Sequence, residues 1–261
     1  MTELNPIERL TRDVRASSKL MDRTQARFLV DSYYQMQENR IRADGQIRSI
    51  EDQEPTAVLD WLSDQNSALE NQIKGALKVY VEDQEIGKWA LNICGIGPVI
   101  AAGLIAHIDI EKAPTVGHIW RFAGLDPTLS WQKGEKRPWN ASLKVICWKA
   151  GESFVKVSNN ENDIYGKIYA ARKEYEAKRN EAGELADQAA AKLAKFKIGK
   201  TTEAYKAYSV GKLPPAHIHA RAKRYAVKLF LSHFWEEWRR IEGLEIVAPY
   251  PIAHMGHVHK I

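Results

Sequence analysis

The stretch Ile93-Cys94-Gly95-Ile96-Gly97-Pro98-Val99 joins two apolar segments, and it decides how the rest of the chain is interpreted. Gly95 and Gly97 permit a positive φ and allow another backbone to approach closely. Pro98 suits the first turn of a helix, because the amide hydrogen that it lacks would have no helical partner. The pattern therefore predicts a helix, a glycine turn and a second helix, which together form a helix-hairpin-helix.

The beginning of the second helix is a candidate anion site. Backbone amides at a helix start have no helical acceptor, and the helix dipole favours negative charge there. A phosphate oxygen can satisfy these amides without any contact to a base. A simple turn between two core helices is the alternative interpretation. The residues of this turn that we expect at a nucleic-acid backbone are Gly95, Ile96, Gly97, Val99 and Ile100.

Two long helices are predicted before this turn. Residues 22–50 and 57–81 place apolar side chains at helical spacing, and Pro55 fits the start of the second segment. We expect the two segments to form an antiparallel helical pair, which also offers a surface for a homodimer. No segment alternates with the period of two that a half-buried strand shows, so the expected fold class is all-α.

The chain after the turn is also predicted to be helical. A loop at 128–140 precedes a helix at about 141–157, and the Ala/Glu/Lys-rich stretch 165–207 predicts a projecting helical hairpin with weak core content. A closing amphipathic helix is expected at about 217–241. The expected segments are an N-terminal helical region (1–84), a helix-hairpin-helix domain (85–160), an inserted helical hairpin (161–214) and a closing helix with its tail (215–261).

Charge is unevenly distributed along the chain. The 261 residues carry a net charge of +5, and the isoelectric point is about 9.0. Residues 1–90 have a charge balance of −4, whereas residues 91–261 have a balance of +9. Such asymmetry indicates an acidic partner, most commonly DNA or RNA, although a solvated basic surface produces the same composition.

Other classes of protein are disfavoured by the sequence. No apolar run is long enough to span a bilayer, and the first residues lack a signal-peptide pattern, so we expect a cytoplasmic protein that does not enter membranes. Cys94 and Cys147 are expected to be free thiols, because they are far apart and form no C-x-x-C pair. No nucleotide-binding glycine motif is present, and we expect no cofactor.

Two basic clusters lie beyond the glycine turn. The cations of the loop lie between Trp131 and Trp139, whose indoles either stack on bases or anchor the loop to the core. The cations of the closing helix follow at spacings of three and four, which places them on one helical face that is either solvated or in contact with phosphates. The candidate phosphate-binding cations are Lys133, Lys136, Arg137, Lys144, Arg221, Arg224 and Lys228.

Several motifs taken together resemble one known family. I-C-G-I-G-P-V-I-A-A-G-L-I-A-H-I-D-I at 93–110 and I-W-R-F-A-G-L-D-P at 119–127 resemble the C-terminal transposase domain of the DEDD/serine insertion-sequence transposases, the bridge-RNA-guided recombinases. In that family a G-I-G-P hairpin precedes a Y-A-G-L-x-P element, a basic loop and a G-N-x-x-L-[RK] helix. W-N-A-S-L-K at 139–144 resembles the last element, and residues 220–235 resemble the closing helix of the family. The resemblance covers about residues 85–160 and 215–240.

The departures from the family concern its chemistry. Family members begin with a RuvC-like α/β nuclease domain that carries four acidic metal ligands, and the helical N-terminus of this chain has no strands to hold them. The position of the nucleophilic serine of the family is occupied by Lys136, while Ser142 lies two residues after Asn140. The resemblance therefore implies a DNA-binding relative from a mobile element or phage, without strand cleavage. An active transposase or recombinase, or a metal-dependent nuclease, that uses Ser142 or the histidine clusters is one alternative, and a helical module that binds another protein is a second.

Histidines are the remaining candidates for metal chemistry. His217 and His219 form an H-I-H pair, and the tail carries His254, His257 and His259 in an H-x-x-H-x-H pattern. Histidine is a common metal ligand, but no carboxylate completes a known motif here. We therefore expect no metal site and keep the three tail histidines as the candidates if one exists.

Overall fold

The computed structural model describes residues 8–50 and 56–247, and every regular element in these ranges is helical. This confirms the all-α fold class. By their internal contacts the residues divide into two compact units. Of the described residues, unit 1 comprises 8–50, 56–92 and 96–112, and unit 2 comprises 93–95 and 113–247. The units differ from the four expected segments, because the helix after the glycine turn belongs with the N-terminal pair.

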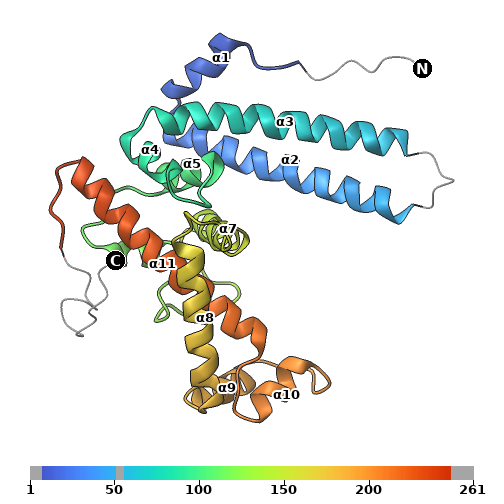
Figure 1. Ribbon diagram of the computed structural model, residues 1–261, viewed down its shortest axis with the longest axis vertical. Helices are drawn as coiled ribbons and strands as arrows, with labels where there is room; N and C mark the ends of the chain where they lie inside the picture. Colours follow the sequence, from blue (N-terminus) through green and yellow to red (C-terminus); the bar gives the residue numbers. More distant parts are fainter. Residues whose placement is uncertain (1–7, 51–55, 248–261) are drawn as a thin grey trace. The chain divides into compact units, whose positions relative to one another are not determined.

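Unit 1 is built on a long antiparallel helical pair, as the sequence predicts. In Figure 1 the helices α2 (Arg23–Ser49) and α3 (Ala57–Glu82) run side by side. Asp22 begins α2 with a capping box, since its carboxylate accepts the amide of Gln25 and the Gln25 side chain accepts the amide of Asp22. Pro55, expected at the start of α3, lies outside the described residues. The smaller helices of unit 1 are α1 (Arg12–Ala16), the 3₁₀ helix η1 (Ser17–Leu20), α4 (Glu85–Leu91) and α5 (Pro98–His107).

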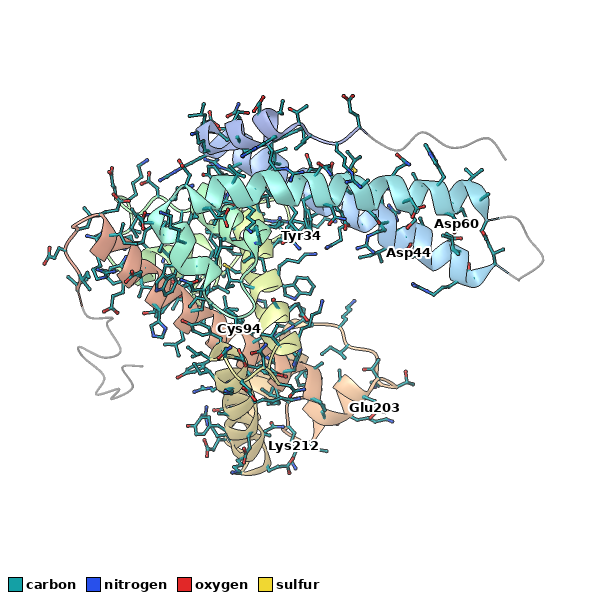
Figure 2. All side chains as sticks on the ribbon, turned by 45° about the horizontal axis from the view of Figure 1, so that its top comes forward. Tyr34, Asp44, Asp60, Cys94, Glu203 and Lys212 are labelled. Carbon is teal, nitrogen blue, oxygen red and sulfur yellow. The ribbon has the colours of Figure 1, made fainter. Side chains whose placement is uncertain are left out.

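Polar contacts link the outer part of the α2–α3 pair. Arg40 Nε lies 3.2 Å from Glu70 Oε2, and Ser63 Oγ donates a 2.5 Å hydrogen bond to Asp44 Oδ1. Figure 2 shows Asp44 on α2 toward the end of the pair that joins the two helices. In this part of the pair the buried residue of α2 is the small Ala43, so polar contacts take the place of large apolar side chains between the two helices.

Helix α5 forms the apolar centre of unit 1. It packs against α2 and α3, and its side chains from Ala101 to Ala106 are all buried. Arg27 Nε donates a 2.9 Å hydrogen bond to the carbonyl oxygen of Ala106, which satisfies one acceptor at the end of the helix. Burial on all sides explains why α5 has no polar face, unlike an ordinary surface helix.

Unit 2 is organised around its last and longest helix. Helix α11 (Pro215–Ile241) packs against α6 (Val116–Phe122), α7 (Ala141–Lys156) and α8 (Tyr165–Glu181). An aromatic cluster joins three of these helices, with ring centroids 4.9 Å apart for Phe154 and Tyr165 and 5.3 Å apart for Tyr165 and Phe230. Aromatic pairs at such distances stabilise a core beyond their simple burial.

The Ala/Glu/Lys-rich stretch is less detached from the core than the sequence suggests. Helix α8 runs beside α11 (Figure 1), and Tyr169 is buried against Ala222 and Ala226. Only the short helices α9 (Ala186–Lys195) and α10 (Glu203–Ser209) rest on a small separate apolar cluster, which contains Leu185, Ala189, Leu213 and Ile218. Among the helices of the described ranges, none is both long and apolar enough to cross a bilayer.

Candidate nucleic-acid interface

The glycine turn has two different halves. Gly95 has a φ of 94°, as the sequence analysis expected, and its carbonyl oxygen accepts a 2.5 Å hydrogen bond from Ser153 Oγ of α7. A β-carbon at Gly95 would lie 3.2 Å from side-chain atoms of both Phe154 and Val157. Gly95 therefore serves close packing against α7, where the missing side chain is needed.

The other half of the turn begins helix α5. Gly97 has a φ of −93° and does not use the positive φ that a glycine permits. It is an extended N-cap residue that precedes Pro98 in the first turn. In the part of the chain that the structure describes, no protein acceptor takes the amide hydrogens of Gly97, Val99 or Ile100. Ile96 and Val99 are buried, so this helix start offers backbone groups and no charged side chain.

The basic loop after α6 is closed at its base and stiffened by its tryptophans. The amide of Asn140 donates a 2.8 Å hydrogen bond to the carbonyl oxygen of Phe122, and the Asn140 side chain caps α7 by accepting the amide of Leu143. The rings of Trp131 and Trp139 meet edge to face at 6.4 Å. Both indoles are therefore engaged within the loop and its base.

The loop cations are accessible to solvent. Lys133, Lys136 and Arg137 are exposed, and none of them forms an ion pair within the described residues. The Arg137 guanidinium lies 5.1 Å from the centroid of the Trp131 ring, a cation–π contact that orients it. The loop therefore exposes three positive charges, and the hydrogen bond between Asn140 and Phe122 closes its base.

Lys144 extends this charge onto α7. Its ammonium nitrogen lies 4.1 Å from the centroid of the Trp139 ring. Partial burial and the nearby positive charges of Arg224 and Arg137 lower the pKa of Lys144 below its ordinary value. No carboxylate forms an ion pair with Lys144 among residues 8–50 and 56–247.

Two cations on α11 complete the surface. Arg224 also lacks an ion pair in the described ranges, and burial together with Arg221 lowers its pKa. Lys228 lies one turn further along, with its ammonium 4.1 Å from the centroid of the Trp120 ring. Burial lowers the pKa of Lys228, and the negative charge of Asp126 opposes this shift only in part. We call the four side chains Arg137, Lys144, Arg224 and Lys228 the basic surface.

Arg221 has a different role from the one expected. Its Nε lies 2.9 Å from Glu176 Oε2, and its Nη1 donates a 2.6 Å hydrogen bond to Gln188 Oε1. Glu176 is 1% exposed. Burial raises the pKa of its carboxyl group, but the hydrogen bonds from Arg221 and Arg172 help to lower it by a larger amount, so the carboxylate stays charged. Arg221 is thus committed to the contact between α8 and α11, and the expectation of a phosphate contact does not fit its neighbours.

A pocket lies beside the basic surface, and the sequence analysis missed it. It has a volume of about 240 Å³ and opens between α7, α11 and the residues that follow α6. Trp148 forms one wall, with 55% of its side chain exposed. The remaining lining residues are Gly124, Leu125, Lys144, Cys147, Gly151, Ala220, Lys223, Arg224 and Val227.

The other candidates for chemistry are Ser142 and the histidines. Ser142 is half-buried in the first turn of α7, and its hydroxyl has no hydrogen-bond partner among the described residues. His217 and His219 each bond to a tyrosine hydroxyl, at 3.2 Å and 2.6 Å, and no group of potential metal ligands occurs in the described part of the chain. The tail histidines His254, His257 and His259 lie outside that part.

The two cysteines are free, as expected. Cys147 is buried, and burial raises the pKa of its thiol to about 12, which makes it an unreactive packing residue. Cys94 is only half-buried in the glycine turn. Comparison of the chain with protein-family models, with curated proteins and with solved structures found no match.

Proposed function

We propose that this chain binds the phosphate backbone of DNA through the basic surface of unit 2. The supporting observation is the pair Lys144 and Arg224. Both cations line the same pocket between α7 and α11, and neither has an ion pair within the described residues. After burial, the charge of Arg224 is the next cause of the lowered pKa of Lys144. Holding like charges together is unfavourable in the free protein, and a bound anion removes that penalty.

The form of the surface favours a phosphate backbone over a single small anion. The loop cations Lys133, Lys136 and Arg137 add exposed positive charge to that of Lys144 and Arg224, and none of the three forms an ion pair within the described residues. Flexible lysines and an arginine on a surface hold phosphates and carry no base information. We therefore propose binding that is largely independent of sequence.

The family resemblance supports DNA as the nucleic acid. The G-I-G-P turn, the A-G-L-D-P element and the closing helix resemble a transposase C-terminal domain. Gly124 and Leu125 of the second element line the same pocket as Lys144 and Arg224. We propose that the chain is a mobile-element or phage protein derived from such a domain. The proposal includes no strand cleavage, because the hydroxyl of Ser142 has no hydrogen-bonded base within the described residues.

A salt titration tests the proposal. Fluorescence anisotropy with labelled oligonucleotides of unrelated sequence, repeated at several salt concentrations, gives the logarithm of the association constant against the logarithm of salt concentration. Contacts to about four to six phosphates predict a linear decrease with a slope of about −4 to −5 on duplex DNA, with similar affinity for each sequence. An affinity that is independent of salt, or no binding at low salt, contradicts the proposal.

A further inference from the structure

The large exposed face of Trp148 has no structural role that the fold explains. Helix α7 buries Leu143, Ile146, Cys147, Ala150 and Phe154 on one face, and Trp148 projects from another. Trp148 is 55% exposed, so a large apolar ring surface is in contact with water. This exposure is unfavourable, and burial in the core would avoid it. The ring is available to a ligand that presents a flat face.

The pocket beside Trp148 combines an apolar floor with a cationic rim. Leu125, Cys147, Ala220 and Val227 contribute apolar atoms. Gly151 brings the two helices together, since a β-carbon there would lie 3.1 Å from Val227 Cγ2. The rim carries Lys144, Lys223 and Arg224, of which Lys223 is paired with Glu152 and the other two have no ion pair within the described residues.

The size of the pocket limits what can enter it. Its volume of about 240 Å³ is below the roughly 300–1,000 Å³ that is typical of pockets for drug-sized ligands. One planar heterocycle fits this space better than a larger molecule. Lys149 Nζ and Lys223 Nζ lie 5.8 Å and 5.7 Å from the centroid of the Trp148 ring, so two ammonium groups, one of them paired with Glu152, lie near the indole on which a base would stack.

From this geometry we infer that the pocket receives an unstacked nucleobase of a single-stranded segment, which stacks on Trp148 while the adjoining phosphates contact Lys144 and Arg224. The inference rests on the proposed function, because the same two cations hold the backbone. Bases in an intact duplex are stacked on each other and cannot present a face to Trp148, whereas bases in a single strand can. Stacking on an aromatic side chain accepts any base, in agreement with binding that is independent of sequence.

The test compares Trp148→Ala and Trp148→Phe on single-stranded and duplex oligonucleotides of equal length. Removal of the stacking ring is expected to weaken single-strand binding about five- to a hundredfold and to change duplex binding less than about twofold. The phenyl ring of Trp148→Phe is expected to restore most of the loss. Trp61→Ala is the matched control, since Trp61 is also an exposed tryptophan, 42% accessible on α3, and lies outside unit 2.

The outcomes separate this inference from the proposed function. If the wild-type protein binds no oligonucleotide, both fail. If binding is sensitive to salt but Trp148→Ala leaves single-strand affinity unchanged, or weakens single-strand and duplex binding equally, only the stacking inference is overturned. A mononucleotide that binds as tightly as the single strand also overturns it, because the pocket would then serve a free nucleotide. Circular dichroism of each variant confirms that the helices are intact.

Discussion

Replacement of Lys144 and Arg224 by methionine should weaken DNA binding in a predictable way. Methionine keeps an unbranched apolar stem, whereas both charges and the cation–π contact of Lys144 with Trp139 are lost. Each exposed cation–phosphate contact contributes about 1 kcal/mol. The double variant should therefore lose about 2 kcal/mol, which corresponds to about a thirtyfold increase in Kd.

The salt dependence gives a second, independent magnitude. Each phosphate that a cation neutralises contributes about 0.9 to the slope of log K against log salt on duplex DNA. Removal of two such contacts should reduce the slope by about 1.8. The assay is anisotropy with a labelled duplex at four or more salt concentrations, performed on the wild-type protein and on the variant.

The matched control removes two other positive charges from unit 2. Lys178 and Lys206 are exposed, and each is already paired with a glutamate, Glu174 or Glu203, at 2.7 Å. Their replacement by methionine changes the net charge equally but should alter the slope by much less than the double variant does. Equal losses in the two double variants, or no loss in the Lys144→Met/Arg224→Met protein, would refute the assignment of phosphate binding to this surface.

Three further predictions concern the fold. His217→Gln should reduce the loss of stability on acidification. Burial lowers the pKa of His217 to about 4, so its contribution to the free energy of unfolding is present above about pH 6.5 and is lost as the pH falls towards 4. Denaturant titrations at several pH values measure this dependence. Arg221→Met should lower that free energy by about 1–3 kcal/mol, because the buried Glu176 loses a partner, while DNA affinity changes little; unchanged stability would contradict this role. Gly124→Ala should lower the thermal midpoint, since φ is 65° and a β-carbon would meet Trp139 at 2.8 Å; an unchanged midpoint would exclude the close packing.

Hydrophobic periodicity allowed the long helices to be predicted. Helices α2, α3, α7 and α11 begin and end within a few residues of the expected positions, because each has a regular buried face. The short α1 and η1 were not predicted, since neither contributes more than one buried side chain to the periodic pattern. The packing of α8 on α11 was also missed, because it depends on scattered residues such as Tyr169 and Glu176 instead of an apolar stripe.

The candidate site was predictable in its charges but not in its geometry. Lys144 and Arg224 were recognised as cations, whereas their proximity depends on the crossing of α7 and α11 at Gly151. The spacing of Arg221 and Arg224 predicts that they share one helical face. The sequence does not show that Arg221 donates a hydrogen bond to the buried Glu176, which lies forty-five residues away in the chain. A helical projection of α7 would have found Trp148, since this residue falls outside the face defined by the buried residues of α7.

Chemical protection of Lys144 tests the central claim most directly. The protein is acetylated with an amine-reactive reagent, with and without bound DNA, and modification of each lysine is quantified by mass spectrometry. The account predicts that DNA protects Lys144, that high salt removes this protection, and that the ion-paired Lys178 reacts equally in both states. Full reactivity of Lys144 in a sample saturated with DNA would contradict the account.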